Sequence, residues 1–217
     1  MKNNVIASIA ENKLIAILRG VPQEKLIAVA EALYAGGIRL MEITYSADGR
    51  ISDEDTAASI GMLARHMEGR MYIGAGTVLT EKQVRLTKAA GGLFVISPNT
   101  DEKIIRASVD CGLVSIPGAL TPTEIVNAHN AGADFVKLFP ASDFGIGYVK
   151  AITAPLSHIK LLAVGGVDDK NIPDFFKAGV CGFGVGSNII DKKLIAAEDY
   201  AGIAQLARKY VQAVENN

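Results

Sequence analysis

One lysine of this chain stands in a strongly apolar segment. Lys137 lies in the sequence DFVKLFP, with Phe135 and Phe139 two positions away on either side. Burying an ammonium group without a partner is costly, and desolvation lowers its pKa. A neutral amine is the form that adds to a carbonyl carbon and makes a Schiff base. The pattern therefore favours a nucleophilic lysine, and a lysine held in a buried ion pair is the alternative.

A glutamate occupies a comparable place in a second apolar segment. Glu42 lies in the sequence LMEIT, two residues before Thr44. In an eight-stranded parallel barrel the second and sixth strands face each other, so Glu42 would approach Lys137 from the opposite wall. There its carboxyl group could remove and return protons during carbonyl chemistry. The alternative, that Glu42 only neutralises Lys137 or Arg19, stays open.

Two further polar residues fit the binding of a carboxylate. Arg19 ends the segment LIAILR, and its guanidinium offers paired donors that match a planar carboxylate. Thr77 ends the segment YIGAGT, and strand alternation predicts that it points into the lumen of the barrel, on one face with Ile73 and Ala75. We expect both residues at the mouth of the barrel near the amine. A salt bridge from Arg19 to Glu42 is the alternative.

Two consecutive strand ends are rich in glycine. They contribute Gly165 and Gly166 from AVGGV, and Gly186 and Ser187 from GVGS. Glycines let backbone N–H groups approach an anion, and we expect a helix that begins after Ser187 to point its positive end there. The loops after the seventh and eighth strands are the usual phosphate position in a barrel. A phosphate site is predicted here, with turns that simply need glycine as the alternative.

These residues fall at the ends of a regular series of short apolar runs. Eight runs alternate with helix-like stretches, which predicts a parallel sheet covered by helices. Eight such units close a barrel, so we expect an α/β fold, a single-domain (β/α)8 TIM barrel over residues 1–217. An open doubly wound sheet would want a glycine-rich phosphate turn after the first strand, which the sequence lacks. The runs are Leu14–Arg19, Arg39–Tyr45, Tyr72–Thr77, Phe94–Pro98, Val114–Gly118, Phe135–Pro140, Lys160–Gly166 and Gly182–Ser187.

The stretches between the runs carry helix signals. Pro22–Leu33, Thr80–Ala89 and Asp168–Ala178 have helical periodicity or capping residues. Thr121 followed by Pro122 predicts another helix, with the cap before a proline at the first helical position.

Composition and charge exclude several classes of partner. The net charge is −1, so there is no basic excess for a nucleic acid or an anionic membrane. No run is long and apolar enough for a transmembrane helix, and the N-terminus has no secretory h-region. Two cysteines without a CxxC spacing and three histidines without ligand spacing predict neither a metal nor a disulfide framework. A cytoplasmic protein is expected.

Taken together, these segments resemble the KDPG/KHG aldolase family. Its members are 2-keto-3-deoxy-6-phosphogluconate aldolases and 4-hydroxy-2-oxoglutarate aldolases. The resemblance covers nearly the whole chain, and its motifs occur in order at the predicted strand ends. These motifs are LIAILRG at 14–20, EIT at 42–44, GAGTV at 74–78, ISP at 96–98, PG at 117–118, KLFP at 137–140 and GG at 165–166.

The resemblance implies a role for each candidate residue. Lys137 would be the Schiff-base lysine and Glu42 the general acid/base. Thr77, Pro98 and Phe139 would surround the pyruvate part of the substrate. The phosphate would lie in the region of Gly165, Gly166 and Ser187. The resemblance also implies a homotrimer that needs no cofactor and no metal.

The expected function is that of a class I aldolase. It would reversibly cleave 2-keto-3-deoxy-6-phosphogluconate to pyruvate and glyceraldehyde 3-phosphate, in carbohydrate metabolism of the Entner-Doudoroff type. A second reaction would cleave 4-hydroxy-2-oxoglutarate to pyruvate and glyoxylate. The alternatives are an isomerase or lyase without a covalent step and, in another class, a non-catalytic barrel that binds a phosphorylated ligand.

Two positions depart from the pattern of the family. Many members carry an arginine four residues after the catalytic glutamate, where this chain has Ser46, so Arg19 is expected to bind the carboxylate instead. The residue before the glycine pair is often threonine, and here it is Val164. The phosphogalactonate aldolases share the sequence AVGG, so 2-keto-3-deoxy-6-phosphogalactonate is the alternative substrate.

Overall fold

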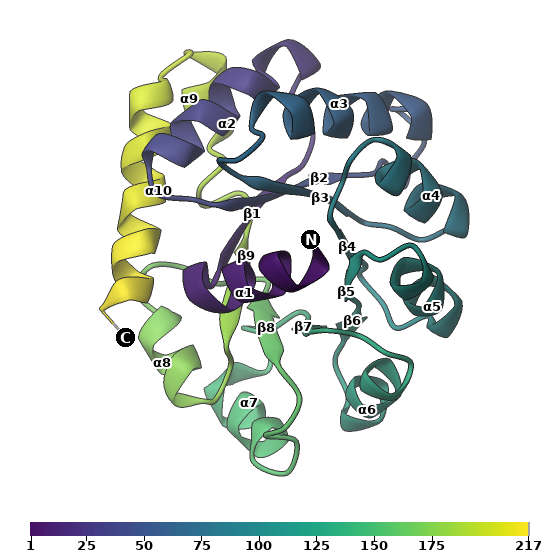
Figure 1. Cartoon of the computed structure of the whole chain (residues 1–217). Coiled ribbons are helices and arrows are strands. Elements are labelled where there is room, and N and C mark those ends of the chain that lie inside the picture. Colours follow the sequence, from purple (N-terminus) through teal and green to yellow (C-terminus); the bar gives the residue numbers. More distant parts are fainter. Residues whose placement is uncertain (217) are drawn as a thin grey trace.

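The strands of the computed structural model, which describes residues 1–216, form one ring of parallel strands (Figure 1). Their order in the sheet is β5-β4-β3-β2-β1-β9-β8-β7-β6. Each predicted run contains a strand, and the expected (β/α)8 barrel is confirmed. The strands are β1 (Leu14–Leu18), β2 (Leu40–Thr44), β3 (Tyr72–Gly76), β4 (Phe94–Ile96), β5 (Val114–Ile116), β6 (Gly118–Ala119), β7 (Val136–Leu138), β8 (Leu161–Val164) and β9 (Gly182–Val185).

The ring closes through a strand that Pro117 divides. The predicted run Val114–Gly118 appears as β5, which pairs with β4, and β6, which pairs with β7. A proline has no backbone N–H and cannot donate to a ladder, so the pairing changes sides at this residue. The carbonyl of Pro117 still accepts a hydrogen bond from the Lys137 N–H at 2.8 Å. One covalent strand therefore joins the two ends of the sheet.

Helices surround the ring on its outside, apart from the first helix, which lies across one end of the ring (Figure 1). Among residues 1–216, none of these helices is long and apolar enough to cross a membrane. The helices are α1 (Lys2–Asn12), α2 (Leu26–Ala35) after a 3-10 turn (Gln23–Lys25), α3 (Asp53–His66), α4 (Glu81–Ala89), α5 (Glu102–Asp110), α6 (Pro122–Asn130), α7 (Gly145–Thr153), α8 (Ile172–Lys177), α9 (Lys192–Ala196) and α10 (Tyr200–Glu215).

Capping residues set the starts of two predicted helices. Thr80 and Gln83 form a capping box at α4, and Thr121 and Glu124 form one at α6. In each box the threonine hydroxyl accepts a backbone N–H while the longer side chain bonds back to the threonine N–H. Pro122 occupies the first turn of α6, as its missing N–H allows. The caps fix where the chain leaves the two preceding loops, and both loops lie at the mouth of the barrel.

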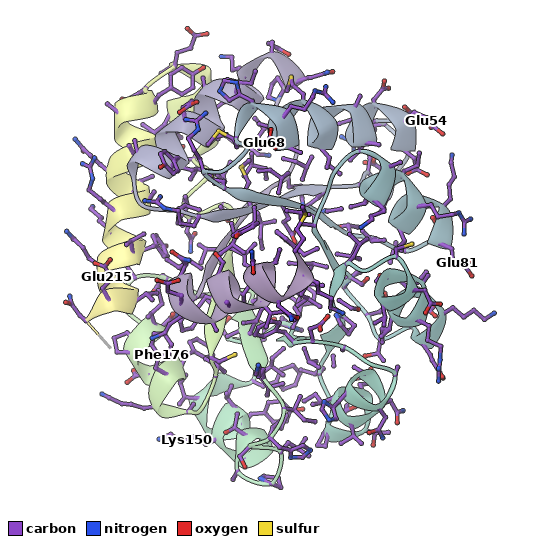
Figure 2. All side chains as sticks on the ribbon, viewed as in Figure 1. Glu54, Glu68, Glu81, Lys150, Phe176 and Glu215 are labelled. Atoms are coloured by element: carbon purple, nitrogen blue, oxygen red, sulfur yellow. The ribbon has the colours of Figure 1, made fainter. Side chains whose placement is uncertain are left out.

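Two apolar clusters fill the molecule. The larger lies between the strands and the helices, and the smaller fills the inside of the ring. Figure 2 shows side chains packed inside the ring, while the labelled Glu54, Glu81 and Glu215 point outward. The inner cluster contains Ile15, Leu40, Phe94, Ile96, Val114, Ile116, Phe135 and Leu162 of the strands, and Val5 and Ile9 of α1.

Helix α1 closes one end of the barrel. It lies across the ring in Figure 1, before β1 in the chain, and so covers the amino-terminal ends of the strands. Val5 and Ile9 are 0% and 1% exposed against the inner cluster. Lys2 adds an ion pair to Asp134 at 3.0 Å. This helix was not predicted from the sequence, because its apolar residues Val5, Ile6 and Ile9 lie before the first of the eight repeating units.

Candidate active site

Lys137 lies in β7 with its side chain inside the barrel. It lines a small apolar cavity together with Ile15, Ile17 and Leu162, and it is 8% exposed. Burial lowers the pKa of its ammonium group, the charge of Glu42 opposes this shift, and the charge of Arg19 adds to it. The predicted apolar surroundings of this amine are therefore present.

Glu42 lies on the opposite wall of the ring, in β2. Between β2 and β7 stand β1, β9 and β8 on one side, and β3, β4 and the divided β5–β6 strand on the other. Glu42 is 2% exposed, and burial raises its pKa to about 7 against the opposing charges of Lys137 and Arg19. Its Oε2 atom is buried without a hydrogen-bond partner. Such a carboxyl group can both take and release a proton near neutral pH.

No ion pair within 4.0 Å joins Glu42 to Lys137 or Arg19 in the part of the chain that the structure describes. The two acid–base groups influence each other through their charges and remain separate. The alternative of a tight buried ion pair is therefore wrong for this structure. A space between an amine and a carboxyl group suits a substrate better than a direct contact does.

Glycines of β3 make room for the carboxyl group. Glu42 is the register partner of Gly74, and a Cβ atom added to Gly76 would lie 2.3 Å from Glu42 Oε1. At Gly74 the same space is taken by the ring of Phe94. Because the strand offers no side chain there, the carboxyl group rests directly on the backbone of β3.

Arg19 and Thr77 meet at the mouth of the barrel. The Nη2 atom of Arg19 donates to Oγ1 of Thr77 at 3.0 Å. The face predicted for Thr77 is wrong, because Ile73 and Ala75 belong to the outer cluster. Thr77 itself has a φ of 56°, which interrupts the alternation and turns its side chain toward Arg19. The hydrogen bond between Arg19 and Thr77 was not predicted, and the binding of a carboxylate by these two residues stays a prediction.

A hydrogen-bond network holds the loop that follows Thr77. Ser97 Oγ donates to the carbonyl of Val78 at 2.8 Å, and Gln83 Oε1 accepts the Leu79 N–H at 2.8 Å. These two bonds, one buried and one partly buried, oppose relaxation of the left-handed residue Thr77. The roles of Ser97 and Gln83 were not predicted from the sequence. The T-x-x-Q pattern of Thr80 and Gln83 is a signal that could have found one of them.

Phe139 and Pro98 flank the lysine. The Lys137 Nζ atom lies 4.7 Å from the centre of the Phe139 ring, and that ring is 38% exposed at the mouth. Pro98 packs on Gly118, where an added Cβ atom would lie 2.4 Å from the Pro98 carbonyl atoms. Gly118 is the register partner of Lys137. The structure thus brings Pro98, Phe139 and Lys137 into one neighbourhood.

Val164 lines the same small cavity as Lys137. It is the last residue of β8, and its side chain packs beside Gly184 of β9, where an added Cβ atom would lie 2.9 Å from Val164 Cγ2. Val164 therefore presents only methyl groups to this cavity, where a threonine would also present a hydroxyl. This departure lies inside the site and not at its edge.

The two glycine-rich ends lie side by side. Gly165 and Gly166 have φ angles of 93° and 69°, which glycine adopts without strain. Asn188, one residue after Ser187, donates its Nδ2 to the carbonyl of Val167 at 3.0 Å and so ties the two loops together. The loops after β8 and β9 are therefore adjacent, and the phosphate site expected between them stays a prediction.

The expected helix after Ser187 is wrong. The chain makes a single turn instead, closed by the bond from the Ile190 N–H to the Gly186 carbonyl at 2.9 Å. Helix α9 begins only at Lys192, after Asp191 has capped it. Helix polarity at this end is therefore weaker than predicted, and an anion would depend on backbone N–H groups and hydroxyls.

The arrangement combines three chemical capacities in one mouth. A buried amine with a lowered pKa faces a carboxyl group that titrates near neutrality. A guanidinium and a hydroxyl stand at the entrance. A glycine turn with open backbone lies on the other side. Among residues 1–216 there is no group of three or more His, Cys, Asp or Glu side chains that could hold a metal ion.

Sequence comparisons with known proteins point to one family. The family model described as KDPG and KHG aldolase matches residues 5–206. The 2-dehydro-3-deoxy-6-phosphogalactonate aldolase of Escherichia coli is 35% identical over 201 residues, which cover 92% of this chain and 93% of that protein. The 2-dehydro-3-deoxy-phosphogluconate aldolase of Haemophilus influenzae is 29% identical, with 97% of each chain covered.

One similar solved structure contains a reaction intermediate. The KDPG aldolase of Legionella pneumophila, with pyruvate captured as a covalent carbinolamine intermediate, has a TM-score of 0.83 at 28% identity. The match covers 94% of this chain and 96% of that one. That enzyme therefore forms a covalent adduct with pyruvate on a closely similar fold.

Proposed function

The chain belongs to the KDPG and KHG aldolase family and is therefore an aldolase, a lyase; from this premise we propose that it is a class I enzyme that uses Lys137 to cleave a 2-keto-3-deoxy-6-phospho sugar acid. The products would be pyruvate and glyceraldehyde 3-phosphate. The observation that carries the proposal is the buried amine of Lys137, which faces the buried carboxyl group of Glu42 across the barrel.

The reaction begins with the attack of Lys137 Nζ on the C2 ketone. The carbinolamine loses water and becomes a protonated imine, which attracts electrons. Glu42 takes the proton of the C4 hydroxyl, the C3–C4 bond breaks into the imine, and the aldehyde leaves with C4 as its carbonyl carbon. The enamine then takes a proton at C3, and water at C2 releases pyruvate and the free amine. A carboxyl pKa near 7 suits a group that must work in both directions.

The other residues would orient the substrate. The paired donors of Arg19, beside Thr77, fit the carboxylate of the pyruvate part. Pro98 and Phe139 supply apolar walls beside the imine. The loops with Gly165, Gly166, Gly186 and Ser187 would hold the phosphate through backbone N–H groups and a hydroxyl.

Among the C4 epimers, we favour the phosphogalactonate over the phosphogluconate. Val164 supports this choice, because its methyl groups stand beside Lys137 where a threonine would offer a hydroxyl. The identity of 35% to the phosphogalactonate aldolase, against 29% to the phosphogluconate aldolase, points the same way. Cleavage rates on both epimers and on 4-hydroxy-2-oxoglutarate will rank the substrates. Equal rates on the two epimers would contradict the preference.

The covalent step is tested by trapping. The protein is incubated with pyruvate, reduced with borohydride and digested, and the adduct is located by mass spectrometry. We expect the adduct on Lys137 and its loss in the variant Lys137→Met. Lys160→Met is the matched control, because the amine of Lys160 also lies over an aromatic ring, that of Phe135. An adduct on a different lysine would overturn the proposed mechanism.

Absence of any adduct in the native protein would favour a different function. A barrel that only binds a phosphorylated ligand would bind inorganic phosphate without trapping pyruvate. A homotrimer, as the family resemblance implies, also belongs to the proposal, and sedimentation velocity measures the assembly state. A monomeric enzyme with full activity would remove the trimer from the proposal and leave the chemistry intact.

A further inference from the structure

Ser142 lies directly over the glycine turn that follows β8. It belongs to the loop after β7, and a Cβ atom added to Gly166 would collide with its Oγ atom. Its backbone N–H donates to the Gly165 carbonyl at 3.2 Å, next to the bond from the Ala141 N–H to the Val164 carbonyl at 2.9 Å. The pairing of β7 with β8 thus continues beyond the strands and brings the hydroxyl onto the turn.

The hydroxyl of Ser142 has a weak partner. It donates to Oδ1 of Asp143 at 3.3 Å, a long bond between neighbouring residues at the surface. Good hydroxyl–carboxylate bonds are much shorter, so this contact stabilises the present rotamer only slightly. A rotation about the Cβ–Oγ bond would leave the oxygen over Gly166 and turn its proton away from Asp143, so that a phosphate oxygen on the turn could accept it.

The glycine turn leaves space for such a ligand. Gly166 is exposed, and its carbonyl accepts a bond from Asn171 Nδ2 at 2.8 Å, which fixes the orientation of the peptide. On the other side of Gly165 lies Phe139, whose ring is 3.3 Å from the position of an added Cβ atom. Ser142 and Phe139 therefore border the turn from the same segment. Neither residue is more than five positions after Lys137 in the sequence.

We infer that Ser142 is a further phosphate-binding residue, which donates its hydroxyl to the phosphate of the substrate above Gly166. This inference rests on the proposed function and adds a donor to the loops after β8 and β9. Because the same segment carries Lys137, the chain would hold both the imine carbon and the phosphate. The distance between the two ends of the substrate would then be set by one short segment, which favours phosphorylated acids of one length.

The test compares phosphorylated and unphosphorylated substrates in the variant Ser142→Ala. For the 6-phospho sugar acid we expect KM to rise about tenfold with little change in kcat, equivalent to about 1.4 kcal/mol. For 4-hydroxy-2-oxoglutarate, which has no phosphate, both constants should stay at the native values. The matched control is Ser157→Ala, an exposed serine in the turn before β8, which should change neither substrate. An equal change on both substrates, or no change on either, would overturn the inference.

A second readout does not depend on aldolase activity. Inorganic phosphate should raise the Tm of the native protein, because a ligand that binds the folded state stabilises it. The shift should shrink in Ser142→Ala and remain in Ser157→Ala. An equal phosphate shift in native protein and Ser142→Ala would count against Ser142 even if no substrate is cleaved. Failure of pyruvate trapping, with a shift that still depends on Ser142, would reject the aldolase mechanism alone.

Discussion

Glu42 carries its carboxyl group where a charge is unfavourable. It is 2% exposed, one oxygen lacks a hydrogen bond, and burial raises its pKa to about 7. The ordinary value for a glutamate is 4.5. The folded protein therefore keeps a proton on this group at a pH where the unfolded chain has released it. Stability and acid–base function are opposed at this one residue.

The variant Glu42→Gln should separate these two effects. Below pH 4.5 both states of the native protein are protonated, so the variant and the native protein should differ least. As the pH rises from 4.5 to about 7 only the unfolded state ionises, so the native free energy of unfolding falls by up to about 3 kcal/mol. The variant lacks this loss and should become relatively more stable, while its kcat falls.

Urea unfolding at a series of pH values, at one protein concentration, measures this difference. Parallel stability profiles from pH 4 to 8 for the two proteins would show that Glu42 titrates normally. In the native enzyme, kcat for cleavage should also decline as the pH falls through about 7, since the protonated carboxyl cannot accept the hydroxyl proton.

Single residues were predicted well where burial alone defined them. Lys137 and Glu42 stand out because a charged residue in an apolar strand is unusual in any sequence. Thr77 and Ser142 differ. Thr77 reaches Arg19 through a left-handed φ, which no pattern of residue types announces. Ser142 meets Gly166 only through the packing of two loops that are distant in sequence.

At the scale of the elements, β3 has no room for side chains at the two glycine positions that face Glu42 and Phe94. The carboxyl group of Glu42 occupies the space that a side chain at position 76 would need, and Gly74 leaves the same kind of space for Phe94. Strand β3 therefore pays for its two glycines with backbone entropy. The absence of side chains at these positions leaves space in which the Glu42 carboxyl group lies against the β3 backbone.

The variant Gly76→Ala should displace the carboxyl group. Its new methyl group would lie 2.3 Å from Glu42 Oε1, so either the side chain or the strand must shift. We expect kcat to fall by about tenfold or more and the free energy of unfolding to drop by about 1–3 kcal/mol. The matched control is Gly147→Ala, where nothing lies within 4 Å.

Gly147 lies in α7, so its replacement should stabilise the helix by about 0.5–1 kcal/mol and leave kcat unchanged. Steady-state kinetics and urea unfolding of the two variants provide the comparison. A Gly76→Ala enzyme with native kcat would mean that the carboxyl group can move without consequence.

Element prediction succeeded where the apolar runs were clear. All eight runs contain strands, and the threonine caps of α4 and α6 were found from their neighbours. Element prediction failed where contacts with distant segments determine the ends of an element. The run Val114–Gly118 is divided at Pro117, where the partner strand changes from β4 to β7, and helix α9 begins at Lys192, after its cap Asp191, and not after Ser187. Pro117 and Asp191 are local signals for these two features, but the sequence does not show which neighbouring strand pairs on each side of Pro117.

For the molecule as a whole, α1 completes a core that the eight units leave open. Val5 and Ile9 contact the inner cluster, whose aromatic members Phe94 and Phe135 are almost fully buried. Without these contacts the amino-terminal end of the barrel would expose its apolar interior. The composition of the segment gave no sign of this role, because it depends on a barrel that is formed by the rest of the chain.

The variant Ile9→Ala should weaken the fold and leave the chemistry intact. It removes a side chain that is 1% exposed, so we expect a loss of about 2–5 kcal/mol in the free energy of unfolding. Because α1 lies at the end of the barrel away from Arg19 and Thr77, kcat and KM at a temperature well below the transition should stay native. The exposed control Asn3→Ala should change neither stability nor kinetics. A kinetic defect in Ile9→Ala that exceeds its loss of folded protein would contradict this separation.

The closed amino-terminal end of the barrel determines how substrate and products reach and leave the lysine. With Val5, Ile9 and Phe135 blocking the end behind the lysine, molecules reach Lys137 from the side of the mouth. Under the proposed chemistry the three-carbon acid is tethered at the bottom of this blind well and the sugar phosphate fragment lies above it. The aldehyde product must leave before water can reach the imine carbon and release pyruvate. The shape of the closed barrel alone would then fix the order in which the two products leave.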